Sequence, residues 1–163
     1  FMLQLQKIYS LGEATAITNR VFEKAVSLKR SDILKDPTRE ITPEADESIQ
    51  NILQQLLQHK PVQYVLGEAW FYNMKFKVNE HVLIPRPETE ELVEQLIKDR
   101  KSKLTDPKIL DIGTGSGCIP IAIQKNLPAS LVTAIDISEN TIALAAENAV
   151  LHNTHVNFKQ LDF

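Results

Sequence analysis

The chain has 163 residues, 43% of them hydrophobic and 24% charged, with a formal net charge of −3, which is a globular composition. No apolar run approaches the roughly 20 residues that cross a membrane, and a single cysteine excludes an internal disulfide and favours the reducing cytoplasm. Residues 1–60 carry eight basic and eight acidic side chains, and residues 61–163 are net negative, so we expect no stable nucleic-acid binding.

Residues 1–60 are predicted to form a small helical bundle without a catalytic constellation of its own. Apolar side chains recur at helical spacing in it, and Thr42 is expected to cap the last helix. Ser31 is expected to cap a short helix that ends at Pro37. The predicted helical ranges are 12–28, 31–37 and 42–60.

Residues 61–86 change in character and are predicted to form a hairpin linker. The β-prone runs 68–72 and 75–79 are joined near Asn73, which is typical of a turn. Residues 87–101 then show a helical pattern, with these side chains expected to face inward: Leu92, Val93, Leu96 and Ile97.

From residue 108 onward, strand patterns and helix patterns alternate. The expected strands are 108–113, 130–137 and 155–163, the first of them buried, and the expected helices are 116–127 and 138–153. Ser138 is expected to cap the second of these helices. Such alternation predicts an α/β fold with a parallel, doubly wound sheet.

A glycine-rich loop follows the first of these strands. It reads "LDIGTGSGC", with glycines at 113, 115 and 117, whereas a nicotinamide-binding loop reads G-x-G-x-x-G. Asp111 lies just before the loop, where a carboxylate would oppose a pyrophosphate but suit the cationic groups of S-adenosylmethionine. A dinucleotide, or a tight turn with no ligand, remains an alternative at this point.

Two further acids end the next two strands. Asp136 comes 23 residues after Gly113, where an acid can accept both ribose hydroxyls, and Asp162 can accept from an adenine amine. Three acids at the carboxyl ends of successive strands, beside a glycine loop, indicate an adenosine cleft.

The segments "IPRPETEELVE", "ILDIGTGSGCIPIA", "AIDIS" and "QLDF" together resemble the glutamine-N5 methyltransferases of class I peptide release factors, the HemK/PrmC family. The resemblance implies a helical substrate-recognition domain in residues 1–60, the linker in 61–86, and the start of a Rossmann-like class I methyltransferase domain in 87–163. It also implies S-adenosylmethionine as cofactor, S-adenosylhomocysteine as product, and class I release factors as partners.

The loop chemistry and the resemblance together assign cofactor binding to Arg86, Asp111, Gly113, Thr114, Gly115, Ser116, Gly117, Asp136, Ile137, Asp162 and Phe163. Arg86, between two prolines, would meet the carboxylate at the methionine end, and the alternative for it is a solvated side chain in a rigid linker. Phe71 matches a family position near the substrate glutamine, and its alternative is packing against Trp70 or Tyr72. We expect no metal site, because no cluster of ligands joins the histidines.

The family's catalytic Asn-Pro-Pro-Tyr motif follows its fourth strand, and this chain ends at Phe163 before such a motif. The catalytic residues are therefore not assigned, and we expect the 163 residues alone to be inactive. The alternatives are an adenine-N6 DNA methyltransferase, an N5-glutamine methyltransferase of a ribosomal protein, and a non-catalytic adapter.

Overall fold

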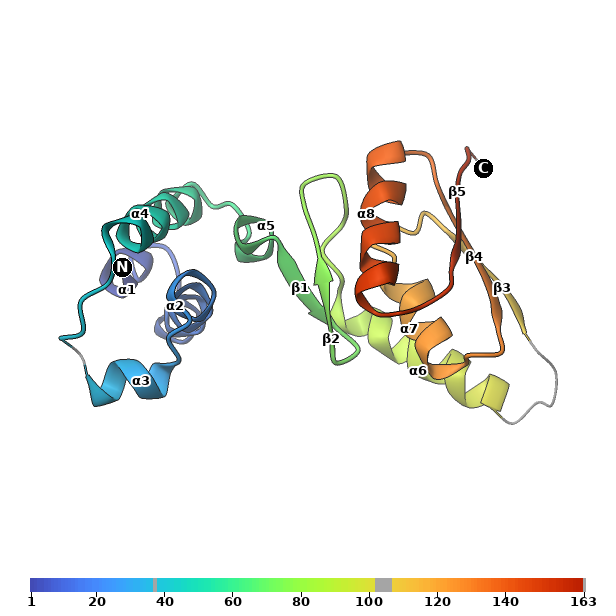
Figure 1. Ribbon diagram of the computed structural model, residues 1–163, viewed down its shortest axis with the longest axis horizontal. Coiled ribbons are helices and arrows are strands. Elements are labelled where there is room, and N and C mark those ends of the chain that lie inside the picture. Colours follow the sequence, from blue (N-terminus) through green and yellow to red (C-terminus); the bar gives the residue numbers. More distant parts are fainter. Residues whose placement is uncertain (37, 102–106, 163) are drawn as a thin grey trace. The chain divides into compact units, whose positions relative to one another are not determined.

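The computed structural model describes residues 1–36, 38–101 and 107–162 (Figure 1). Contacts divide the chain into two compact units, Phe1–Leu66 and Gly67–Phe163. The first contains α1 (Met2–Leu5), α2 (Leu11–Val26), α3 (Arg30–Lys35), α4 (Pro43–Leu57) and α5 (Val62–Leu66). The second contains β1 (Glu68–Phe71), β2 (Met74–Lys77), α6 (Pro87–Lys101), β3 (Lys108–Ile112), α7 (Cys118–Asn126), β4 (Leu131–Asp136), α8 (Glu139–Leu151) and β5 (Asn157–Gln160).

The first unit is a helical bundle, as predicted. Ser10 begins α2 with a capping box in which its side chain accepts from the Glu13 N–H while the Glu13 carboxylate accepts from the Ser10 N–H. Thr42 caps α4 as expected, accepting from the Ala45 N–H at 3.3 Å. The buried core of the unit consists of Leu5, Ala14, Ile17, Val21, Leu53, Leu56 and Leu66.

One local prediction in this unit was wrong, and two short helices were not predicted. Ser31 is not an N-cap: the N-cap of α3 is Lys29, two residues earlier, and its N–H donates to the Asp32 carboxylate at 3.0 Å. Pro37, the expected end of that helix, lies outside the described residues. The short helices α1 and α5 were not predicted, since four or five residues are too few to show a helical period.

The second unit opens with the predicted hairpin. Strands β1 and β2 pair antiparallel, with Phe71 opposite Met74. Between them Tyr72 and Asn73 both have positive φ, 49° and 58°, which is typical of the type I′ turn that matches the twist of two strands. The hairpin prediction is confirmed.

The predicted parallel sheet is also confirmed, with strand order β3-β4-β5. Helices α6, α7 and α8 lie along one face of this sheet (Figure 1). Val132 of β4 and Ala149 of α8 belong to the same buried core as Val93 of α6 and Ile121 of α7. The strands and helices therefore share one packed core. This core fixes the positions of the loops that follow the carboxyl ends of the strands.

Two expectations about burial were wrong. Strand β3 is not buried on both faces: Leu110 is 54% exposed, because α6–α8 cover only the face that carries Ile109. In helix α6, Leu92 is 62% exposed, while Val93 and Ile97 form the buried stripe, one turn apart. Among the described residues, no helix is long and apolar enough to cross a membrane.

Candidate functional site

The glycine loop between β3 and α7 is held over the end of β4 by backbone hydrogen bonds. The N–H groups of Gly113 and Thr114 both donate to the Ile135 carbonyl, at 2.9 and 3.0 Å. The Gly117 N–H donates to the Thr114 carbonyl at 3.0 Å. The loop therefore has a defined shape without a ligand, which reduces the ordering that a ligand would have to impose.

One side of the loop is open. Gly113 and Gly115 have positive φ values of 75° and 56°, and a Cβ added at either would meet no atom within 4 Å. Their backbone thus faces free space, and a ligand can approach the chain closely there.

Glycine is needed at position 117 for a different reason, which is close packing. Gly117 has φ +76°, and a Cβ there would lie 3.1 Å from both the Ala145 Cβ and the Ile121 Cδ1. Glycine at 117 lets α7 and α8 pack closely beneath the loop.

Replacing Gly117 with alanine should destabilise the second unit by about 2–4 kcal/mol, since a left-handed non-glycine residue costs roughly 1–2 kcal/mol and overpacking adds a similar amount. The measurement is thermal unfolding followed by fluorescence of Trp70, the one tryptophan in the sequence, which lies in this unit. Gly115→Ala is the matched control, since Gly115 also has a positive φ, of 56°, but a Cβ there has no close contact. Equal losses in the two variants would contradict the packing explanation.

Asp136, the last residue of β4, ties the loop to the start of α8. Its Oδ2 accepts from the Gly115 N–H at 3.1 Å, and its Oδ1 accepts from the Ser138 N–H at 3.1 Å. Each carboxylate oxygen keeps a further lone pair for a ligand hydroxyl. The next residue, Ile137, is 64% exposed and offers an apolar surface beside the carboxylate.

Several buried polar atoms of the site have no hydrogen-bond partner in the described structure: Asp111 Oδ2, Thr114 Oγ1 and Ser116 Oγ. Burial raises the pKa of Asp111 and the charge of Asp136 acts in the same direction, while the nearby Thr114 hydroxyl lowers it. Unpaired buried polar groups are costly, so their concentration around one loop indicates a place prepared for a ligand. A cationic group near Asp111 would stabilise its carboxylate.

The segment before α6 meets the glycine loop. A cavity of about 110 Å³ is lined by Leu83, Ile84, Pro85, Arg86, Thr89, Gly113, Thr114, Gly115, Ser116, Cys118 and Ile119. Arg86 and the glycine loop are thus brought together, although they lie far apart in the sequence. Thr89, which the sequence analysis did not single out, joins them from the first turn of α6. The volume is below the usual ~300–1,000 Å³ of a ligand pocket, so this cavity fits only part of a cofactor.

Other predicted residues lie around or away from this cavity. The Leu161 N–H donates to the Asp136 carbonyl at 3.0 Å, which places the exposed Asp162 close to the end of β4. Phe163 lies outside the described residues. Phe71 is 1% exposed and packs in the core, with its ring centroid 6.3 Å from that of Phe76. Packing, though against Phe76, thus accounts for its burial, and its place near a substrate glutamine stays a prediction.

Cys118, the first residue of α7, also lines this cavity. Burial raises the pKa of the Cys118 thiol to about 11, so the thiol stays protonated and is a poor nucleophile. The described residues include no group of three or more histidine, cysteine or carboxylate side chains placed to hold a metal ion.

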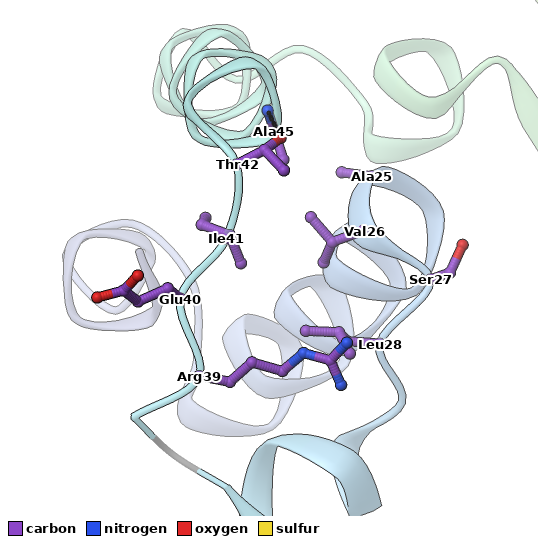
Figure 2. A pocket seen from close by; sticks show the side chains of 9 residues that line it. All are labelled: Ala25, Val26, Ser27, Leu28, Arg39, Glu40, Ile41, Thr42 and Ala45. Carbon is purple, nitrogen blue, oxygen red and sulfur yellow. Dashed lines mark hydrogen bonds between the residues drawn. The ribbon is translucent and has the colours of Figure 1, made fainter.

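A second cavity, of about 340 Å³, lies in the helical unit (Figure 2). It is enclosed by the end of α2, the start of α4 and the loop before α4. The Arg39 side chain extends toward Leu28, whereas Glu40 points away from the cavity. Its lining contains no glycine loop and no inward carboxylate, so it does not have the chemistry of a nucleoside site.

Two protein-family models match this chain. One described as the PrmC N-terminal domain matches residues 3–67, and one described as ribosomal protein L11 methyltransferase (PrmA) matches residues 88–162. The release factor glutamine methyltransferase of Flavobacterium psychrophilum is 44% identical over 160 residues, 97% of this chain and 56% of the relative. That of Streptococcus pneumoniae is 42% identical over 158 residues, 96% of this chain and 56% of the relative. The chain thus spans about half the length of these curated relatives, and the resemblance to them is confirmed.

Among solved structures, a SAM-dependent methyltransferase from Agrobacterium tumefaciens matches with a TM-score of 0.50 and 19% identity, over 58% of this chain and 32% of that protein. At this level of identity the likeness concerns the fold alone. It confirms the predicted Rossmann-like α/β class.

Proposed function

We propose that this chain, which is similar to release factor glutamine methyltransferases over 97% of its residues, forms the cofactor half of such an enzyme. The complete enzyme transfers a methyl group from S-adenosylmethionine to the side-chain amide nitrogen of the glutamine in the Gly-Gly-Gln motif of class I release factors. The observation that carries this proposal is the meeting of Arg86 with the open glycine loop in one cavity.

The residues present fit the cofactor. The ammonium and sulfonium of S-adenosylmethionine suit the partly buried Asp111, whose buried Oδ2 accepts no hydrogen bond from the described residues. Asp136 can accept the ribose hydroxyls with its remaining lone pairs, while Ile137 offers an apolar face to the adenine and Asp162 an acceptor for its amine. Arg86 adds a positive charge for the carboxylate at the methionine end.

In this proposal the described residues bind and orient the cofactor. A further segment holds the glutamine amide that accepts the methyl group. An amide nitrogen is a poor nucleophile, because its lone pair is delocalised into the carbonyl. When bound, S-adenosylmethionine supplies a methyl group on a good leaving group. In-line positioning of the two partners should then provide most of the rate enhancement. By resemblance, an Asn-Pro-Pro-Tyr segment outside this chain orients the acceptor amide.

The helical unit is proposed to recognise the release factor, which would place the enzyme in the cytoplasm. The match of residues 3–67 to a PrmC N-terminal domain supports this partner. Residues 1–60 carry eight basic and eight acidic side chains, a balance that disfavours DNA binding. An adenine-N6 DNA methyltransferase is therefore the weaker alternative. The match of residues 88–162 keeps a ribosomal protein as an alternative substrate, but that match does not include the helical unit.

S-adenosylhomocysteine should bind the full-length protein at least about tenfold more tightly than NAD, because Asp111 attracts a cation and repels a pyrophosphate. Isothermal titration calorimetry with the two ligands, under the same buffer and salt, gives both affinities. Tighter binding of NAD would mean that the loop serves a dinucleotide.

A further inference from the structure

A fully buried asparagine lies behind the glycine loop. The side-chain amide of Asn148, in α8, donates from Nδ2 to the carbonyls of Lys77 and Ser116, both at 2.9 Å. Its Oδ1 accepts from the Lys77 N–H at 2.8 Å. Both N–H groups and the oxygen of this amide are therefore used, as a buried amide requires.

The contact with Lys77 satisfies backbone hydrogen-bonding groups at the edge of β2 that does not pair with β1. The next residue, Val78, donates its N–H to the Gly67 carbonyl, so the backbone groups of Lys77 point away from β1. Asn148 meets this N–H and C=O pair with an amide of its own, as the backbone of a neighbouring strand would. One side chain thus fixes the hairpin to α8 and, through Ser116, to the glycine loop.

Two further residues on the same face of α8 extend this attachment. The Thr141 Oγ1 donates to the His81 carbonyl at 3.2 Å, and the His152 Nε2 lies 2.9 Å from the Lys75 carbonyl. The chain from β2 to residue 81 is thereby held along the helix, and the cavity-lining segment from Leu83 to Arg86 follows directly. Of the three residues, Asn148 is the one that also holds the loop.

We propose that Asn148 is a positioning residue that couples the hairpin to the cofactor loop. It fixes the Ser116 peptide on one side and the Lys77 peptide on the other, so that the loop and the segment around Arg86 face the same cavity. Ordering of the loop by the cofactor then orders the hairpin as well. The role toward the cofactor rests on the proposed function, whereas the coupling itself does not.

The test uses amide hydrogen exchange in the full-length protein, first without ligand. Asn148→Ala should speed exchange of the Lys77 amide and of the loop amides of Gly115 and Gly117 at least about tenfold, because the loop loses an anchor. Thr141→Val is the matched control, since it releases the hairpin at His81 only and should leave the loop amides within about twofold of wild type. Unchanged loop amides in Asn148→Ala would overturn the inference.

The second arm adds S-adenosylhomocysteine. Asn148→Asp keeps the size and the acceptor for Lys77 but turns an oxygen toward two carbonyls, so affinity should fall at least about tenfold, against less than about threefold for Thr141→Val. In wild-type protein, which needs no variant to fold, the ligand should slow exchange at Lys77, a residue outside the cavity lining. If S-adenosylhomocysteine binds but leaves the exchange rate of the Lys77 amide unchanged, the coupling is refuted. Failure of wild type to bind the ligand would instead refute the proposed function, and the ligand-free arm would still decide the coupling.

Discussion

Asp136→Ala should weaken binding of S-adenosylhomocysteine at least about tenfold, because hydrogen bonds to a carboxylate contribute roughly 1.5–3 kcal/mol each and about 1.4 kcal/mol corresponds to a factor of ten. Two ribose hydroxyls are the expected donors. The loss has a second source in the structure: the Oδ2 of Asp136 accepts from Gly115 at 3.1 Å, so alanine also frees the glycine loop. Binding by calorimetry and stability by Trp70 fluorescence separate the two contributions.

Asp136→Asn removes the negative charge and keeps one acceptor oxygen, but its NH2 group must face the N–H of either Gly115 or Ser138, so one of the two backbone hydrogen bonds is lost. Asp46→Ala, on the exposed surface of α4, is the control for a change of net charge. We expect the asparagine variant to bind weakly and to melt earlier than wild type, though less early than Asp136→Ala, which loses both hydrogen bonds. If Asp136→Ala keeps wild-type affinity and only melts earlier, Asp136 is a structural residue and the ribose site lies elsewhere.

The elements of the fold could be predicted because local signals decide them. Thr42 and Ser138 accept the expected backbone N–H groups at the starts of α4 and α8. The turn at Asn73 and the alternation after residue 108 likewise depend on neighbours in sequence. At the start of α3 two local signals competed, and the carboxylate of Asp32 outweighed the hydroxyl of Ser31.

Burial was less predictable, because it depends on what covers each face. The apolar pattern of β3 is typical of a strand covered on both sides, yet α6–α8 cover one face and leave Leu110 exposed. Phe71 was equally hard to place from the sequence: it lies in the core beside Phe76, and the place near a substrate that the resemblance implies for it stays a prediction.

The site was predictable as a set of residues but not as an arrangement. The types and spacing of the glycines and acids indicate a ligand site. Their roles as cofactor contacts remain a prediction. Asn148 gave no such signal, since its partners lie 71 and 32 residues away and an asparagine within a helix pattern is usually solvated. Only the fold brings Lys77, Ser116 and Asn148 together.

This site is proposed to bind the cofactor for methylation of a release-factor glutamine. The most direct measurement is transfer of a labelled methyl group from S-adenosylmethionine by the protein that carries these 163 residues together with an Asn-Pro-Pro-Tyr segment. The acceptors are an intact class I release factor, its Gly-Gly-Gln variant with Gln→Ala, and a short Gly-Gly-Gln peptide.

We expect label on the intact factor and none on the Gln→Ala variant. Labelling of the peptide should be weaker, because the peptide lacks the surface that the helical unit is proposed to bind. The 163 residues alone should label none of them, because positioning of the acceptor, which can contribute on the order of 7–11 kcal/mol, is missing. Equal labelling of the factor and its Gln→Ala variant, or no labelling by the longer protein while it binds cofactor, would contradict the proposed function. Labelling by the 163 residues alone would show that the chemistry resides within them.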